Sequence, residues 1–376
     1  MVAGPASTDP KIPAGIALAR DYETVARARL PDATYAYIAG GAGEGTTAER
    51  NLRSFATLAV VPRVLQVLDG ATLAIQLPGL PLAHPVLLAP VAHQILVHEG
   101  AERETARAAG ATGTALVAST LSSCTLETIA AAQGNATRAF QLYLQPDFHD
   151  TADLVRRAER AGYTALFITV DAALQVPGQE ALRAGFRMPP QAVAANLAGY
   201  PATPAPEAPT GPHRLIRAAA AGTPTWDDLR RVKALTGLPV WIKGVMHPED
   251  AQAIRSAGFA GLVVSNHGGR GLDGAPSSLG ALPAIRAVLG DDYPVLFDGG
   301  VRSGQDVFKA IALGADAVMV GRLQLYALAA AGALGVAHML RLLREELEVC
   351  MALSGCATVS AIRRASLQSG AGVTLP

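Results

Sequence analysis

The stretch that decides the fold is Gly261-Leu262-Val263-Val264-Ser265-Asn266-His267-Gly268-Gly269-Arg270. Its first four residues form an apolar run that predicts a buried parallel strand. His267 and Arg270 follow just past the carboxyl end of that strand, in a segment that two glycines loosen. In an α/β barrel the carboxyl ends of the strands carry the chemistry. The stretch therefore predicts a base beside a fixed cation, which together could take a proton from a substrate and hold its negative charge.

An isolated His-Gly-Gly-Arg is more often a glycine turn with a packed histidine and a surface arginine, so the surrounding chain decides its meaning. Short apolar runs recur along the chain, with amphipathic segments of helical period between them. Such alternation indicates a parallel sheet covered by helices on both faces, and eight repeats are the number in a (β/α)8 TIM barrel. We expect an α/β fold with one domain over residues 1–376. The eight runs are residues 86–90, 115–118, 139–143, 165–171, 239–244, 261–264, 294–300 and 317–321.

Two segments depart from this rhythm. Residues 1–60 look helical, with candidate helices at Asp21–Leu30 and Thr34–Ala39, and we expect them to cap the barrel. Roughly 70 residues separate the fourth and fifth apolar runs, and the proline-rich part of this interval, 200–209, cannot form a helix or a central strand. A long loop at the catalytic face is usually a lid or a disordered segment, so residues 172–225 are predicted to form a lid-like insertion.

Composition excludes several classes of protein. Half of the residues are hydrophobic, and 31 basic residues balance 31 acidic ones, so nothing points to nucleic acid or to an anionic membrane surface. The cysteines Cys124, Cys350 and Cys356 are few and form no Cys-x-x-Cys pair, which favours a reducing cytoplasm and argues against a cysteine zinc site. The apolar segment Leu323–Leu340 could be mistaken for a membrane span, but glycines and polar residues interrupt it. A buried helix or helix pair is the better interpretation.

Polar or charged side chains close several of the predicted strands. A single buried polar residue is more often structural than functional. Several of them at neighbouring carboxyl ends, where a barrel gathers its loops, instead predict one catalytic edge. These residues are Gln141, Tyr143, Thr169, Asp171, Lys243, His267, Arg270 and Asp298.

From about residue 20 to residue 365, the chain resembles the family of FMN-dependent 2-hydroxy-acid oxidases and dehydrogenases, which includes glycolate oxidase. The resemblance implies an oxidoreductase that binds FMN and a small-molecule substrate. The family's motifs occur here in the family's order, which makes the match specific. They are Tyr35-Ala36-Tyr37, Phe140-Gln141-Leu142-Tyr143, Thr169-Val170-Asp171, Lys243-Gly244, residues 265–270, residues 298–304, Gly321-Arg322 and residues 351–356.

The resemblance implies a role for each of five residues around the substrate. His267 would be the base that removes a proton at the substrate carbinol, which suits imidazole because its ordinary pKa lies near neutrality. Asp171 would orient His267 and stabilise its charged form. Tyr37, Tyr143 and Arg270 would line the substrate pocket.

The resemblance also implies a set of FMN contacts. Lys243 would stabilise the reduced flavin ring, and Gly300, Arg302, Gly321 and Arg322 would hold the phosphate, the usual anion site of a barrel. Glycine lets backbone N–H groups approach a phosphate, and arginine binds it through two hydrogen bonds. The other FMN contacts would be Val91, Ala92, Ser119, Gln141, Thr169, Ser265 and Asp298.

The chain departs from the family pattern at the substrate. The family places a second carboxylate-binding arginine seven residues after the aspartate that corresponds to Asp171, and Gly178 stands there. A charged hydrogen-bond partner of this kind contributes about 1.5–3 kcal/mol, so we expect poor turnover of simple glycolate or lactate unless Arg183 or Arg187 replaces it. Leu121 also stands where the family has a pocket aromatic. On this view Gly178→Arg would improve turnover of small acids, and larger substrates would be preferred.

Two alternatives stay open at this point. One is an FMN-dependent barrel isomerase similar to type II isopentenyl diphosphate isomerases, and the other is a flavin-binding protein that has lost turnover. The intact set of Tyr37, Asp171, His267 and Arg270 argues against the isomerase. The family resemblance further implies a homotetramer, and we expect a cytoplasmic protein that binds neither nucleic acid nor membrane.

Overall fold

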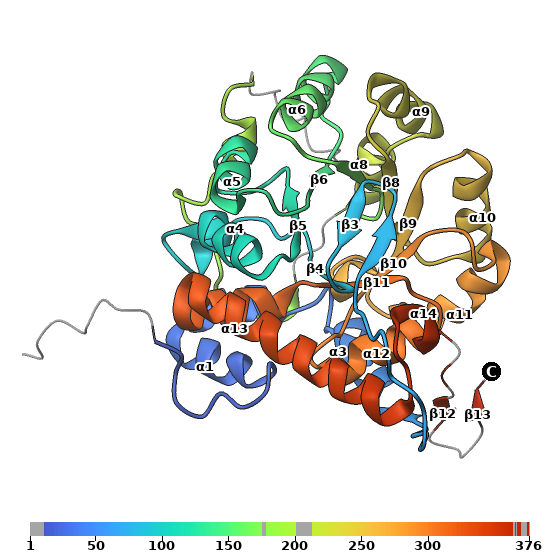
Figure 1. Ribbon diagram of the computed structural model, residues 1–376. Helices are drawn as coiled ribbons and strands as arrows, with labels where there is room; N and C mark the ends of the chain where they lie inside the picture. Colours follow the sequence, from blue (N-terminus) through green and yellow to red (C-terminus); the bar gives the residue numbers. More distant parts are fainter. Residues whose placement is uncertain are drawn as a thin grey trace, which may run out of the picture.

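Eight parallel strands close into one barrel, with the neighbour order β10-β11-β4-β5-β6-β7-β8-β9 (Figure 1). The computed structural model describes residues 11–174, 178–200, 213–363, 365, 367–369 and 374–375, so most of the proline-rich stretch lies outside the described residues. The predicted TIM barrel is confirmed. Its strands are β4 (Val86–Leu88), β5 (Ala115–Ser119), β6 (Arg138–Leu142), β7 (Ala165–Thr169), β8 (Val240–Val245), β9 (Gly261–Val264), β10 (Val295–Asp298) and β11 (Ala317–Val320).

Helices alternate with these strands and cover the outside of the barrel (Figure 1). The main core lies between the helices and the outward-facing side chains of the strands, where continuous apolar runs are buried on both faces, as a parallel sheet requires. The covering helices are α4 (Ala101–Thr112), α5 (Leu126–Gln133), α6 (Phe148–Arg160), α9 (Trp226–Leu235), α10 (Pro248–Ser256), α11 (Ser278–Leu289), α12 (Gly304–Ala312) and α13 (Arg322–Ser354).

A second core fills the inside of the barrel and is closed at one end by a hairpin. The hairpin strands β2 (Ile75–Leu77) and β3 (Leu80–Leu82) pair antiparallel. Leu80 joins Phe167 and Trp241 in this inner core, and the Trp241 indole donates a hydrogen bond to the Pro78 carbonyl at 3.1 Å. The hairpin seals the amino ends of the strands, which leaves the carboxyl ends for the functional site.

Helix α13 explains the apolar segment near the C-terminus. It runs over 33 residues, but Ala331 and Gly332 have non-helical backbone angles and divide it into two helical parts, so the expected buried helix pair is confirmed. Among the described residues it is the one helix long and apolar enough to cross a membrane, but two-thirds of its apolar window is buried inside the fold. It packs against α1 (Asp21–Arg29), α4 and α12, so its apolar face has partners within the chain.

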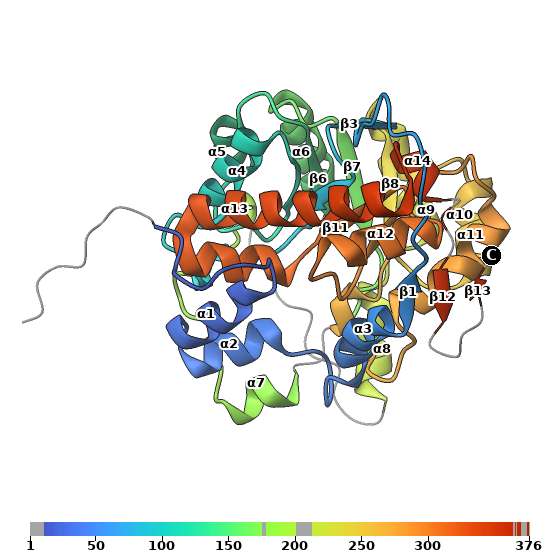
Figure 2. The ribbon, with the colours of Figure 1, turned by 60° about the horizontal axis from the view of Figure 1, so that its bottom comes forward.

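The N-terminal helices and the insertion after β7 gather on one side of the barrel (Figure 2). The helices at 21–30 and 34–39 expected from the sequence are α1 and α2, and α7 contacts α2. The cap and the insertion together roof the carboxyl ends of the strands. The remaining elements are α2 (Asp32–Ala39), α3 (Thr46–Ala56), α7 (Gln179–Arg183), α8 (Arg214–Gly222), α14 (Val359–Ile362), the short 3-10 turns η1 (Gln94–Leu96), η2 (Ala195–Leu197) and η3 (His267–Gly269), and the strands β1 (Leu58–Val60), β12 (Leu367–Ser369) and β13 (Thr374–Leu375).

Candidate active site

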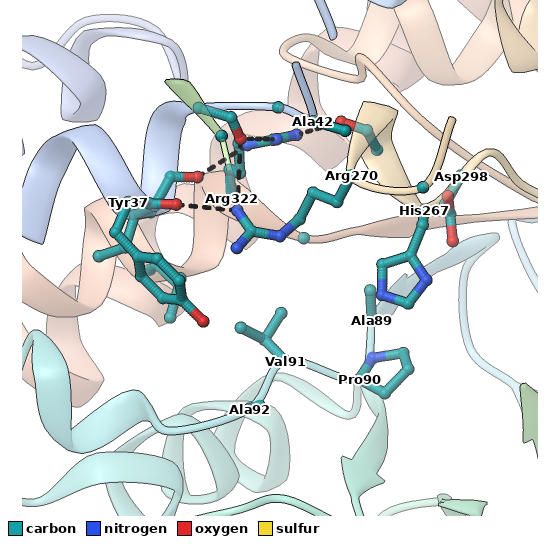
Figure 3. Close-up of a pocket in the computed structure, with 18 of the residues that line it drawn as sticks. Tyr37, Ala42, Ala89, Pro90, Val91, Ala92, His267, Arg270, Asp298 and Arg322 are labelled. Carbon is teal, nitrogen blue, oxygen red and sulfur yellow. Dashed lines mark hydrogen bonds between the residues drawn. The ribbon is translucent and has the colours of Figure 1, made fainter. Parts of the chain in front are cut away.

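A cavity of about 510 Å³ opens at the carboxyl ends of the strands, beneath the cap (Figure 3). Its volume lies in the range of small-molecule and cofactor sites. Three predicted site residues, Gln141, Thr169 and Ser265, stand behind the wall and do not line the cavity. The predicted residues that do line it are Tyr37, Val91, Ala92, Ser119, Tyr143, Asp171, Lys243, His267, Arg270, Asp298, Gly300, Arg302, Gly321 and Arg322.

His267 and Asp171 form a hydrogen-bonded pair at the cavity. The His267 Nδ1 atom lies 2.8 Å from Asp171 Oδ1. Burial raises the pKa of Asp171, but the nearby His267 and Lys243 outweigh it and hold this pKa below its ordinary value. The Asp171 carboxylate is therefore an acceptor at neutral pH, so Nδ1 carries the proton and Nε2 is left free to accept one. This is the orientation that a general base needs.

His267 occupies a strained backbone position. Its φ is +59°, in the left-handed region of backbone angles that residues other than glycine rarely adopt. Such a residue costs about 1–3 kcal/mol and persists only where its surroundings determine it, which is common at functional sites. With this backbone conformation, just past the end of β9, the His267 side chain lines the cavity.

Lys243, Ser265 and Asp298 form a closed group, here called the strand-end cluster, at the ends of β8, β9 and β10. Lys243 Nζ lies 3.0 Å from Ser265 Oγ and 3.0 Å from Asp298 Oδ2, and the Ser265 hydroxyl donates to Asp298 Oδ1 at 2.6 Å. Burial lowers the pKa of Lys243, but the charges of Asp298 and Asp171 outweigh it and raise this pKa above its ordinary value. Lys243 thus stays a cation at the floor of the cavity.

One buried amide donor in this region has no protein partner. Ser119 donates to Gln141 Oε1 at 3.1 Å, which points the other end of the amide away from Ser119. The Gln141 Nε2 group is buried and finds no hydrogen bond among the described residues. A buried unpaired donor is costly, and Gln141 is hydrogen-bonded to Ser119, which lines the cavity, so an acceptor on a bound ring such as a flavin would satisfy this donor.

The opposite end of the cavity suits a phosphate. Gly300 has a φ of +85°, and a Cβ there would lie 2.3 Å from the Asn51 carbonyl oxygen, so only glycine fits. Gly321 precedes the first turn of α13, which no side chain caps, and the space above its Cα is open. Free N–H groups at a helix N-terminus bind anions, and both Arg302 and Arg322 line this end. The residues present therefore fit FMN.

Arg322 is fixed by the cap. Its guanidinium donates to the carbonyls of Ile38, Gly40 and Gly268 at 2.7–2.9 Å. Burial lowers its pKa to about 10, and neighbouring Arg270 acts in the same direction. Arg322 is still charged at neutral pH, and three protein hydrogen bonds hold it in place while two N–H groups remain for a ligand.

Tyr37, Gly178, Phe186 and Arg270 form the cap-side wall of the cavity. The Tyr37 and Phe186 rings stack at 4.1 Å with 8° between their planes, and the Arg270 guanidinium lies over the Tyr37 ring at 4.8 Å. Arg270 also donates to the carbonyls of Tyr37 and Gly40 at 2.8 and 3.3 Å. Figure 3 shows Tyr37 and Arg270 across the cavity from Val91. The wall thus combines one oriented cation with flat apolar rings.

The structure bears on the missing arginine in two ways. A Cβ at Gly178 would lie 2.3 Å from the Gly41 carbonyl oxygen, so Gly178→Arg would push the insertion off the cap instead of restoring a carboxylate partner. Arg183 donates to Gln179 on the surface, and neither Arg183 nor Arg187 lines the cavity. Gly178 is a packing requirement, and neither Arg183 nor Arg187 takes the place of the missing arginine in this structure.

Sequence reasoning missed His93 and the apolar lining from the insertion. His93 lines the cavity with a φ of +52°, and its buried Nδ1 atom has no partner among the described residues. Its backbone N–H donates to the carbonyl of Leu121, which lines the cavity as expected. No motif marks His93 in the sequence. The lining that the insertion adds is Leu174, Ala181, Leu182, Phe186 and Met188.

Comparison with known proteins agrees with this site. The sequence profile described as FMN-dependent dehydrogenase matches residues 26–369. An L-lactate oxidase of Alicycliphilus denitrificans is 58% identical over 96% of this chain and 99% of its own length. A 4-hydroxymandelate oxidase of Amycolatopsis orientalis is 41% identical over 93% of this chain and 98% of its own length.

Solved structures of mandelate oxidase have the same fold as this chain. The crystal structure of mandelate oxidase with (S)-4-hydroxymandelic acid superposes with a TM-score of 0.85 at 41% identity, over 94% of this chain and 99% of that one. At this identity and coverage, both the fold and the FMN dependence are shared. The chain therefore belongs to the family of FMN-dependent 2-hydroxy-acid oxidases and dehydrogenases.

Proposed function

We propose that this protein oxidises a 2-hydroxy acid with an apolar side chain to the 2-oxo acid, with His267 as the base and oxygen as the final electron acceptor. The observation that carries the proposal is the His267–Asp171 pair at 2.8 Å, which faces the same cavity as Arg270 and Lys243. The oxidase names of the relatives support oxygen as the acceptor.

The proposed chemistry divides the work between the chain and the cofactor. Conversion of the substrate carbinol to a carbonyl removes two protons and two electrons. His267 Nε2 takes one proton, and Asp171 stabilises the imidazolium that results, because its lowered pKa keeps it ionised. FMN, when bound, would supply the two-electron oxidation and would take up the second proton. The buried Lys243 cation would balance the negative charge that develops on the reduced ring.

Three side chains would hold the substrate. Arg270 is anchored by backbone carbonyls and by the Tyr37 ring, so its guanidinium is oriented to receive a carboxylate. Burial raises the pKa of Tyr143 to about 12, so its hydroxyl stays a hydrogen-bond donor at neutral pH. Tyr37 would supply a second hydroxyl beside the same carboxylate.

The substrate class follows from the apolar lining together with the names of the relatives. Leu121, Leu182, Phe186 and Met188 face the cavity and would pack against an apolar substituent. Burying about 50–100 Å² of apolar surface contributes roughly 1.3–2.5 kcal/mol, which offsets the lack of a second arginine. The L-lactate and 4-hydroxymandelate oxidases mark the small and large ends of this class. Because the relative at 58% identity is an L-lactate oxidase, L-lactate stays within the proposed substrate class. Glycolate has no side chain that could pack against the apolar lining.

Anaerobic mixing with a substrate panel tests the proposal. The FMN-loaded protein is mixed with L-lactate, (S)-mandelate and glycolate, and bleaching of the flavin absorbance is followed in time. We expect the two substrates with side chains to reduce the flavin, and glycolate to be slowest at equal concentration. A flavin that no 2-hydroxy acid bleaches would contradict the proposal and would favour an isomerase or a flavoprotein without turnover. Faster reduction by glycolate would overturn the substrate class alone.

The homotetramer and the cytoplasmic location stay predictions of the sequence. Light scattering of the holoenzyme at micromolar concentration tests the first, and cell fractionation tests the second. A monomer in solution would contradict the tetramer without touching the proposed chemistry.

A further inference from the structure

The loop that carries His267 has an unusual backbone. His267, Gly268 and Gly269 have φ values of +59°, +63° and +78°, so three successive residues are left-handed. Glycine adopts this conformation freely, but histidine does not. The hydrogen bond from Asp171 reaches the imidazole ring and not the backbone of these three residues. Ser265 Oγ accepts from the His267 N–H at 3.0 Å, and Arg322 donates to the Gly268 carbonyl at 2.8 Å. Helix α3 of the N-terminal cap supplies a further set of contacts to the same loop.

Two asparagines join α3 to this loop. The Asn51 side-chain N–H donates to Asn266 Oδ1 at 2.8 Å, and the Asn266 side-chain N–H donates back to Asn51 Oδ1 at 2.9 Å. Asn51 is 2% exposed and Asn266 is 6% exposed. The two amides thus exchange hydrogen bonds in a buried place, where an unpaired partner would be costly. Asn266 directly precedes the base.

The Asn266 amide carries the effect of this pairing to the loop backbone. The Asn266 Oδ1 atom also accepts a hydrogen bond from the backbone N–H of Gly269 at 3.1 Å. The Asn266 Nδ2 group also donates to the Pro276 carbonyl at 3.0 Å. The first of these contacts spans the strained residues His267 and Gly268. The amide of Asn266 therefore closes the turn, and Asn51 sets the orientation of that amide.

Asn51 also fixes the far end of the same segment. The Asn51 Oδ1 atom accepts a hydrogen bond from the backbone N–H of Ser278 at 3.2 Å. The Ser278 hydroxyl in turn accepts from the backbone N–H of Asn266 at 3.3 Å. In the middle, a Cβ at Gly269 would lie 2.5 Å from the Ala48 nitrogen, so the loop lies directly on α3. A single side chain of the cap thus joins both ends of the segment that carries the base.

We infer that Asn51 is a positioning residue for His267, acting through Asn266. The inference rests on the proposed role of His267 as the base. Without Asn51, the Asn266 amide loses a donor and an acceptor in a buried site and turns to other partners. The loop then relaxes toward an ordinary backbone conformation, and Nε2 moves away from the substrate carbinol. A displacement of about 1 Å at a reacting group can cost on the order of 100-fold in rate.

The test measures flavin reduction per bound FMN in the purified holoenzyme, with the substrate that reduces the wild type fastest. For Asn51→Ala we expect the limiting rate of reduction to fall roughly 10- to 100-fold. Substrate affinity should change little, since Arg270, Tyr37 and Tyr143 are untouched. Asn51→Asp keeps the shape and the acceptor oxygen but loses the donor to Asn266, so its rate should lie between those of Asn51→Ala and the wild type.

A matched control is Thr47→Val on the same helix. Thr47 is fully buried, and its hydroxyl donates to the Leu272 carbonyl at 3.2 Å, so this variant loosens α3 from the distal part of the loop. It should lower the unfolding midpoint while leaving the limiting reduction rate roughly within twofold of wild type, because this hydroxyl bonds to Leu272, beyond the turn that carries His267. A merely structural role for Asn51 would make the two variants behave alike.

A double-mutant cycle measures whether Asn51 and Asn266 act together. If Asn51 acts through Asn266, then Asn266→Ala and the double variant should reduce the flavin equally slowly, because contacting residues are not additive. Equal reduction rates in Asn51→Ala and the wild type would overturn the inference, and so would additive losses in the double variant. A wild type that no 2-hydroxy acid reduces would instead defeat the proposed function, so the two failures are distinguishable.

Discussion

Lys243 and Asp298 of the strand-end cluster line the same cavity as the cap-side wall, but the two regions are held together by different interactions. Lys243, Ser265 and Asp298 stand on adjacent strands and satisfy one another through an ion pair and hydrogen bonds of 2.6–3.0 Å. The cap-side wall has no such closed group. There, Arg270 bonds to backbone carbonyls and lies over a ring, and Gly178 approaches Gly41 because it lacks a side chain.

The difference teaches which half of the site tolerates change. The strand-end cluster is fixed by barrel register, so its geometry is rigid and a change of charge there is severe. The cap-side wall is built from segments far apart in the chain, and its contacts are ring stacking and backbone approach. Substitutions there alter shape more than charge. We expect cofactor chemistry to depend on the first region and substrate choice to depend on the second.

The largest expected effect is at His267, where the two regions meet. His267→Asn removes the base and should lower the limiting rate of flavin reduction by roughly 10²–10⁴-fold while FMN stays bound. Stopped-flow kinetics measure the rate of flavin reduction, and the flavin content of the purified protein shows whether FMN stays bound. His149→Asn is the control, because that side chain is 79% exposed and should leave the rate unchanged. Normal reduction in His267→Asn would mean that the base lies elsewhere.

The second effect breaks the strand-end cluster. Lys243→Met leaves Asp298 as a buried charge without its partner, which costs about 3–5 kcal/mol. We expect a lower unfolding midpoint in denaturant and a smaller FMN content. Adding Asp298→Asn removes the unpaired charge and should recover part of the stability. If Lys243→Met alone unfolded at the wild-type midpoint, the cluster would not be the rigid half of the site.

The third effect tests the cap-side wall. Gly178→Ala places a Cβ 2.3 Å from the Gly41 carbonyl oxygen and should destabilise the docked insertion by about 1–3 kcal/mol, as overpacking does. Gly199→Ala in the same insertion is the control, because its Cβ meets nothing within 4 Å. Thermal unfolding of both holoenzymes measures the difference. Equal midpoints would show that the insertion does not rest on Gly41 in solution.

The smallest effect concerns Tyr143 and pH. Burial raises its pKa to about 12, so the hydroxyl stays protonated at every pH well below that value and loses its proton only above it. Tyr143→Phe removes one hydrogen bond, and should slow reduction by roughly 2- to 10-fold. The ratio of wild-type to variant rate should be the same at pH 6 and pH 10. A ratio that approached one at pH 10 would mean that Tyr143 ionises earlier.

Several features followed from the sequence because they depend on local patterns. Continuous apolar runs with helical segments between them predicted the barrel, since strands buried on both faces must be apolar throughout. The carboxyl ends of parallel strands share one edge, so polar residues there predicted Lys243, Asp298, His267 and Asp171 as one site. All four line the cavity.

The insertion and the cap could not be predicted in the same way. Gly178 read as a missing arginine, whereas its role is a close backbone approach to a cap residue that is remote in sequence. His93 and Phe186 belong to no periodic pattern, so nothing marked them as cavity residues.

The sequence by itself determined the barrel and the cofactor family and predicted residues that line the cavity, because strand burial depends on neighbouring residues and each motif is a short run of the chain. Only the tertiary structure decided how His267 is held and what shapes the cap-side wall. The Asn51–Asn266 exchange and the Tyr37–Phe186 stack each join segments more than 100 residues apart. Contacts of this kind arise when the chain closes on itself, and no local pattern records which distant partner a buried amide or an aromatic ring will meet.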